Sequence, residues 1–193
     1  MDNFLRHFAP GPGARPCDPS LAARFKGRLP EVLLALWRAH GLGSYGDGQL
    51  LLIDPDAYKP LLYGWLMRDD ADEDDSRLPI ALTAFGRIIY YRKLGEGEED
   101  VSSLDPHRSS GMVHAWSLRR FLDDYLCEPE AREALLEPAL LQAARARLGP
   151  LGEHELYYPV PALRLGGRWQ AEQMDKGDGR VHLAWLLDLA CGG

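Results

Sequence analysis

The chain has 193 residues, of which 46% are hydrophobic and 26% are charged, and its formal net charge is −7. This length and composition indicate a soluble globular protein with one large domain or two small ones. The acidic balance argues against broad binding to nucleic-acid phosphates and favours a basic partner. Composition alone does not name a function.

The number and spacing of the cysteines and the length of the apolar segments indicate where in the cell the protein is expected. Cys17, Cys127 and Cys191 are odd in number and widely spaced, which fits a reducing compartment rather than a disulfide framework. The first residues lack a basic region followed by an apolar stretch, so we expect no signal peptide. No apolar run approaches the ~20 residues that a membrane span requires. We therefore expect a cytoplasmic protein with no membrane partner.

Three helices are expected in the first forty residues. Asn3–Phe8 is a short amphipathic start, and a proline- and glycine-rich arm follows it. Ser20 can cap a short helix that reaches Phe25. The clearest helix is Glu31–His40, whose apolar residues recur at helical spacing and which Gly41 ends.

A glycine-rich turn at 43–48 leads to a short apolar strand at 49–53. The turn resembles a phosphate loop only in its glycine count, because it lacks a lysine and precedes a strand. Asp54 or Asp56 can cap the following helix, whose apolar face runs to Leu66. Six acids then occur in the seven residues 69–75, and we expect this run to be a solvated loop that separates two halves.

The stretch Leu78–Lys93 organises the second half. The apolar residues at 80–82 and the run of β-forming residues at 88–91 predict a pair of buried strands around Phe85, the second of which enters a turn at 95–97. A short strand at 101–104, helices at 118–126 and 138–148, strand pieces at 156–158 and 162–165, and a final helix at 181–189 are expected to follow.

Together these elements predict an α/β (α+β) fold with two packed subdomains, each a small sheet with helices. The first is expected to span residues 1–77, including the N-terminal arm and the acidic connection. The second is expected to span residues 78–193.

No residue pattern points to catalysis. The six histidines are spread out without His-x-x-x-His spacing, and no Cys-x-x-Cys occurs, so a zinc site is not expected. Cys17 with His7 as a base could form a nucleophilic pair, but the proline-rich surroundings favour a free cysteine. We therefore expect no catalytic residue, no metal and no cofactor, and a hydrolase is the least favoured class.

Two blocks of sequence carry a family resemblance. The first contains Phe25-Lys26-Gly27-Arg28-Leu29-Pro30, Leu36-Trp37, Gly41-Leu42-Gly43 and Ile53-Asp54-Pro55-Asp56. It resembles the GAD-like domain, although Asp54 stands where asparagine is expected, and both residues suit the turn. The second contains Thr83-Ala84-Phe85-Gly86, Tyr157-Tyr158-Pro159-Val160-Pro161 and Leu165-Gly166-Gly167. It is similar to the domain of unknown function that follows the GAD-like domain in many bacterial proteins.

The resemblance implies a role and supplies no catalytic residue. Proteins with this pair of domains resemble immunity proteins of bacterial type VI secretion, which protect a cell from its own antibacterial effector. The resemblance therefore implies a bacterial cytoplasmic protein that binds a cognate effector, commonly a DNase. Such a protein would occlude or distort the active site of the effector and would not itself bind nucleic acid. The alternative is a small-molecule-binding or regulatory module without a toxin partner.

Two groups of residues are candidates for contact with such a partner. The acidic runs are solvated loops by default, but their carboxylates could also meet the basic groups that a nuclease presents to DNA. Aromatic residues near turns belong to the core by default, but they could instead anchor an interface. The candidates are Asp69, Asp70, Asp72, Glu73, Asp74, Asp75, Glu96, Glu98, Glu99, Asp100, Tyr157, Tyr158 and Trp169.

Overall fold

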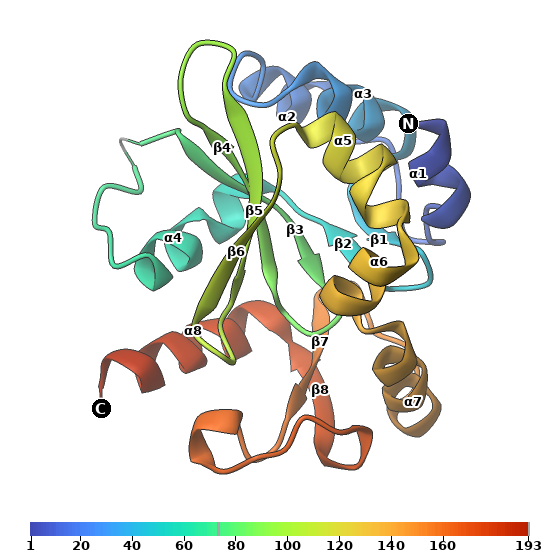
Figure 1. The fold of residues 1–193 in the computed structure, drawn as a ribbon, viewed down its shortest axis with the longest axis vertical. Helices are drawn as coiled ribbons and strands as arrows, with labels where there is room; N and C mark the ends of the chain where they lie inside the picture. The colour runs from blue at the N-terminus through green and yellow to red at the C-terminus, as the bar shows by residue number, and fades with distance from the viewer. Residues whose placement is uncertain (73, 193) are drawn as a thin grey trace.

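The Leu78–Lys93 stretch forms two strands at the centre of a six-stranded antiparallel sheet (Figure 1). A computed structural model describes residues 1–72 and 74–192. The sheet has the order β1-β2-β3-β4-β5-β6, and β7 pairs with β8 in a separate sheet. The strands are β1 Gly43–Tyr45, β2 Leu50–Leu52, β3 Arg77–Thr83, β4 Ile88–Lys93, β5 Glu99–Asp105, β6 Ser110–Ala115, β7 Glu155–Pro159 and β8 Met174–Asp178. The expected mixed α+β class is confirmed.

Helices cover both faces of the large sheet (Figure 1). The helices are α1 Asp2–His7, α2 Pro19–Arg24, α3 Glu31–His40, α4 Pro55–Trp65, α5 Leu118–Asp123, α6 Pro129–Leu136, α7 Pro138–Leu148 and α8 Gly179–Cys191. Along β4, Ile89 and Tyr91 pack into a core with α1, α2, α3, α5 and α6, whereas Ile88 and Tyr90 pack into a core with α4 and α8. Alternate strand residues point to opposite faces, so β4 is apolar throughout because it is buried on both sides.

Local capping explains where several helices begin and end. Gly41 ends α3 with φ +91°, a conformation that favours glycine. Asp54 caps α4 as expected, and its side chain accepts a hydrogen bond from the backbone N–H of Asp56 at 3.1 Å. The cap of α2 is Asp18 rather than Ser20, because Pro19 occupies the first helical position and Asp18 accepts from the Ser20 N–H at 2.8 Å.

The large sheet continues across the expected boundary between residues 77 and 78. Leu50 of β2 pairs with Thr83 of β3, and Leu52 pairs with Ala81. The two sides of that boundary therefore share one sheet rather than each having a separate large one. A third, smaller core lies under β7, β8 and α7. The separation of residues 1–77 and 78–193 as independent units stays a prediction.

Some expected elements differ in the structure. Residues 43–45 of the expected turn form β1, because they pair with β2. The expected strand at 162–165 is a 3-10 helix, Leu163–Leu165, that turns at Gly166 with φ +86°. β6 and β8 have no counterpart in the sequence prediction, since neither has strict apolar alternation. Within the described residues, no helix is both long and apolar enough to cross a membrane.

Candidate partner-binding surfaces

The two acidic loops lie at the same end of the large sheet. The first loop leads into β3, and the second, at 94–98, joins β4 to β5. Arg77 at the start of β3 pairs with Arg92 near the end of β4, and the Lys93 N–H donates to the Ser76 carbonyl at 2.8 Å. Antiparallel pairing thus brings together two acidic segments that are about twenty residues apart in the sequence.

Four carboxylates on these loops are free to meet a partner. Asp69, Asp72, Glu96 and Glu98 are exposed and, within the described part of the chain, form no ion pair. We call these four residues the acidic end. Glu73 belongs to the same run but lies outside the described residues.

Three aspartates of the first run hold the loop in place. Asp70 forms an ion pair with Arg68, and the hydrogen bond from that guanidinium lowers the pKa of Asp70. Partial burial alone would raise the pKa of Asp74, but hydrogen bonds from Ser76 and the charge of Arg68 lower it to about 2.

The last aspartate of the run, Asp75, lies between two cations from earlier elements. Lys59 of α4 is 2.9 Å from its carboxylate, and Arg28 pairs with the same oxygen at 2.5 Å. Burial opposes ionisation, but these two cations lower the pKa of Asp75. The C-terminal part of the run is therefore fastened to α4 and the segment before α3, whereas Asp70 in its N-terminal part pairs only with the nearby Arg68, and Asp69 and Asp72 are exposed.

The second acidic segment also divides into free and engaged carboxylates. Glu99 accepts hydrogen bonds from the Tyr91 hydroxyl at 3.0 Å and from the Leu118 N–H at 2.9 Å. Asp100 is 0% exposed and pairs with Arg92. Neither carboxylate is presented freely at the surface, so we leave Glu99 and Asp100 out of the contact surface that we propose below.

The candidate aromatic anchors lie at the opposite end of β3 and β4. The Tyr157 N–H donates to the Ala84 carbonyl at 2.9 Å, which attaches β7 just beyond the end of β3. β3 has seven residues, so about 20 Å of strand separates this end from the acidic end. The acidic and aromatic candidates therefore do not form one patch.

Each aromatic side chain packs against other groups of this chain. Tyr157 is 0% exposed, and its hydroxyl donates to the Gly149 carbonyl. Tyr158 stacks on His182 with ring centroids 3.7 Å apart. Trp169 is only partly buried, donates to Glu137 at 2.6 Å and lies 4.3 Å from the guanidinium carbon of Arg108. Tyr157 thus serves the core, whereas Tyr158 and Trp169 keep part of their surface in solvent.

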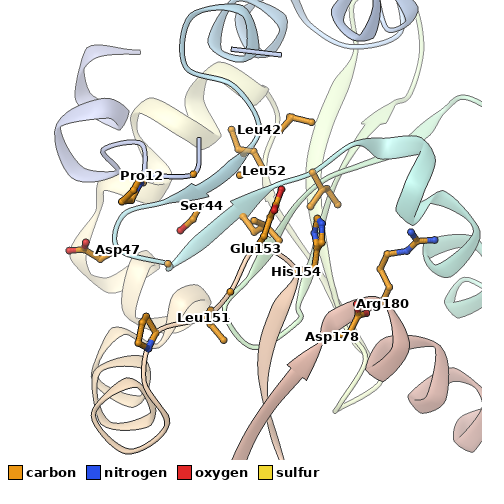
Figure 2. A pocket seen from close by; sticks show the side chains of 18 of the residues that line it. Pro12, Leu42, Ser44, Asp47, Leu52, Leu151, Glu153, His154, Asp178 and Arg180 are labelled. Atoms are coloured by element: carbon orange, nitrogen blue, oxygen red, sulfur yellow. The ribbon is translucent and has the colours of Figure 1, made fainter. Parts of the chain in front are cut away.

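A cleft of about 990 Å³ lies between the N-terminal and C-terminal parts of the chain. Figure 2 shows its labelled side chains, which come from the N-terminal arm, the segment 42–52 that contains β1 and β2, the segment 151–154, and the junction between β8 and α8. Leu42, Leu52 and Leu151 give it an apolar lining, and charged residues such as Glu153 and Arg180 also line it. A cleft of this size can receive a side chain or loop of a partner, or a small molecule.

Sequence reasoning missed this cleft, because its walls come from distant segments. The glycines at 43–48 were expected to form a structural turn, and they form one wall beside β1. Only the breaker pair Gly149-Pro150, which ends α7, marks the opposite wall in the sequence. Within residues 1–72 and 74–192, no group of three His, Cys, Asp or Glu side chains is placed to hold a metal ion.

Comparison with known proteins agrees with the fold and the order of its parts. Among solved structures, the fold is similar to the crystal structure of Atu4351 from Agrobacterium tumefaciens, with 19% sequence identity and a TM-score of 0.72 over 96% of this chain and 87% of that chain. At this identity the likeness concerns the fold alone. A search of curated protein sequences found no match.

Two family models match consecutive parts of the chain. The model for the C-terminal domain of the type VI secretion immunity protein Tdi1 matches residues 116–190, which supports a role in type VI secretion immunity. The GAD-like domain model matches residues 1–99, about half of the chain. The chain therefore belongs to the GAD-like domain family, with a Tdi1-type immunity domain after the GAD-like domain.

Proposed function

We propose that this protein binds a cognate antibacterial effector of type VI secretion, that the effector is a DNase, and that binding occludes or distorts its active site. The observation that carries the proposal is the succession of the GAD-like domain and the Tdi1-type immunity domain in one chain. Neutralisation by binding requires no catalytic group on the immunity protein, only a surface that complements the effector.

The acidic end supports the choice of a nuclease as partner. A nuclease presents Lys and Arg to DNA phosphates, and clustered carboxylates can attract the same positive surface. Asp69, Asp72, Glu96 and Glu98 are exposed and converge from two loops at one end of the sheet. The overall charge of −7 adds long-range attraction to a basic partner.

Survival of cells that produce the effector tests the proposal. The effector, sought as the product of the neighbouring gene, is expressed with or without this protein, and chromosomal DNA is examined for cleavage. We expect co-expression to restore growth and to keep the DNA intact. Toxicity that persists in the presence of folded protein would contradict the proposal, and protection against an effector that leaves DNA intact would contradict the nuclease assignment.

The cleft favours a second candidate function, a small-molecule-binding module. Its volume of about 990 Å³ lies at the upper end of the range for ligand pockets, and its lining includes both apolar and charged side chains. Under this alternative, a metabolite raises the thermal stability of the free protein, and Leu151→Trp, at a partly buried position that lines the cleft, abolishes that effect. The immunity role requires no such ligand, so a protein that protects cells without one excludes the alternative.

A further inference from the structure

The walls of the cleft come from both family-matched parts of the chain. One wall, which includes Leu42, belongs to the region that the GAD-like model matches, and the opposite wall, which includes Leu151, belongs to the region that the Tdi1-type model matches. The guanidinium of Arg145 on the second wall donates to the Asp47 carbonyl of the first wall at 3.3 Å. The cleft therefore needs both parts of the chain, and their succession is also the observation that supports the immunity role.

Three arginines line the cleft without a carboxylate partner. Arg15 comes from the N-terminal arm, Arg145 from α7 and Arg180 from the first turn of α8, and all three are exposed. None of them forms an ion pair with any residue that the structure describes. The guanidinium carbon of Arg180 instead lies 5.9 Å from the centre of the Tyr58 ring. Each arginine is therefore free to pair with a carboxylate that enters the cleft.

The carboxylates that line the cleft offset these charges only in part. Asp54 and Asp178 cap α4 and α8, and Asp54 also pairs with Arg24 at 3.1 Å. The Asp47 side chain points away from the other labelled side chains of the cleft, whereas Glu153 points among them (Figure 2). An occupant of the cleft therefore meets three unpaired arginines and one unpaired carboxylate, so the groups that complement the cleft are anionic.

Apolar side chains also line the cleft. Leu42, Leu51 and Leu151 are all partly exposed there. An apolar side chain of an occupant gains by leaving water for these leucines, while neighbouring carboxylates pair with the arginines. The volume of about 990 Å³ lies at the upper end of the range for drug-sized ligands, so the cleft has room for a short loop of a partner protein.

We propose that the cleft receives a loop of the effector in which carboxylates flank an apolar side chain. This inference rests on the proposed function and adds a basic contact to it. Of the described residues that line the cleft, none belongs to the acidic end. The effector is thus held by two contacts of opposite charge, because the acidic end meets basic groups and the arginines of the cleft meet acidic ones. A partner with the wrong charge at either contact is repelled.

Charge reversal in the cleft tests the proposal. Arg15→Glu combined with Arg180→Glu should raise the dissociation constant for the purified effector by about tenfold or more, because both new side chains repel the loop. Arg6→Glu combined with Arg168→Glu, at two exposed positions outside the cleft, is the matched control with the same change in net charge. Isothermal titration calorimetry measures the dissociation constants, and circular dichroism verifies that both variants are folded.

A photo-cross-linking amino acid at Leu151 identifies the occupant. In the complex it should capture an effector segment that contains Asp or Glu beside an apolar residue. The same amino acid at Met112, which is 59% exposed on β6 and outside the cleft, should not capture that segment. Changing the captured carboxylates to amides should weaken binding to the wild-type protein, and it should weaken binding much less in the variant with Arg15→Glu and Arg180→Glu.

The outcomes separate this inference from the proposed function. A wild-type protein that binds no effector would overturn both together. Effector binding that the reversal of Arg15 and Arg180 leaves unchanged would overturn the inference alone, as would a captured segment without a carboxylate. Citrate serves as the probe for a free organic anion. If citrate raises the thermal stability of the free protein, and the reversal abolishes this effect without weakening effector binding, the cleft belongs to a small molecule instead.

Discussion

The carboxylate of Asp100 on β5 is fully buried against the guanidinium of Arg92, its direct partner on β4. The Arg92 Nε lies 2.9 Å from Oδ1 and 3.0 Å from Oδ2, and the Ser102 hydroxyl donates to Oδ1 at 2.9 Å. The hydrogen bond and charge of Asp100 in turn raise the pKa of Arg92. A residue at the end of an acidic run thus belongs to the interior of the sheet.

Removing this carboxylate should destabilise the fold rather than the complex. In Asp100→Ala, Arg92 keeps its charge but loses its partner, and breaking such a pair costs about 3 kcal/mol of unfolding free energy. Urea unfolding at neutral pH measures the loss, with Asp69→Ala as the exposed control. A loss below about 1 kcal/mol would show that the pair contributes no more than a surface ion pair.

Tyr157 is predicted to act through the core of the C-terminal part. It is completely buried and packs near Phe85, with ring centroids 6.1 Å apart. Tyr157→Ala should cost about 3–5 kcal/mol of unfolding free energy, whereas Tyr157→Phe loses only the hydrogen bond to the Gly149 carbonyl, at about 1 kcal/mol. Urea unfolding of both variants shows whether Tyr157→Ala loses more unfolding free energy than Tyr157→Phe. Equal losses would contradict a packing role.

Acidification should destabilise the protein through the buried His107 and the partly buried His114 and His182. Burial lowers the pKa of His107, His114 and His182 to about 4. The charge of the neighbouring His107 lowers the pKa of His182 further. The unfolded chain binds these protons near the ordinary pKa of about 6.5. The folded protein binds them only near pH 4, so the unfolding free energy falls as pH drops from about 6.5 towards 4.

Urea unfolding between about pH 7 and pH 5 measures this slope. His107→Gln retains a donor for the Phe85 carbonyl, which His107 contacts through Nε2 at 3.0 Å, and it should make the slope shallower. His7→Gln at an exposed position is the control. An unfolding free energy that does not change with pH across this window would contradict the assignment.

The acidic end should control how fast the effector associates. Reversal of Asp69, Asp72, Glu96 and Glu98 to lysine should slow association by about tenfold or more at low salt and weaken its salt dependence. Reversal of Glu130, Glu133, Glu172 and Asp188, which are also exposed, gives the same change in net charge elsewhere. Surface-bound kinetics at two salt concentrations compares the two variants. Equal association rates would show that net charge, and not this surface, attracts the effector.

Local signals predicted most of the helices, but α6 has no counterpart among the expected elements, and the helix expected at 118–126 is α5, which ends at Asp123, followed by a 3-10 helix at Tyr125–Cys127. Apolar spacing and Gly41 define α3 at Glu31–His40, and the proline and glycine that flank 138–148 define α7 with the same bounds. β6 escaped prediction because its identity depends on pairing with β5 rather than on its own pattern. The burial of Asp100 escaped for the same reason, since only the register of β4 and β5 places Arg92 opposite it. The cleft depends on the approach of segments about one hundred residues apart.

Inhibition of the purified effector by this protein tests the central claim most directly. Cleavage of duplex DNA by the cognate effector is measured while the protein is added in increasing amounts, with heat-denatured protein as the control. The account predicts that cleavage falls in proportion to the protein added and stops once every effector molecule is bound. Undiminished cleavage with an excess of folded protein would contradict it.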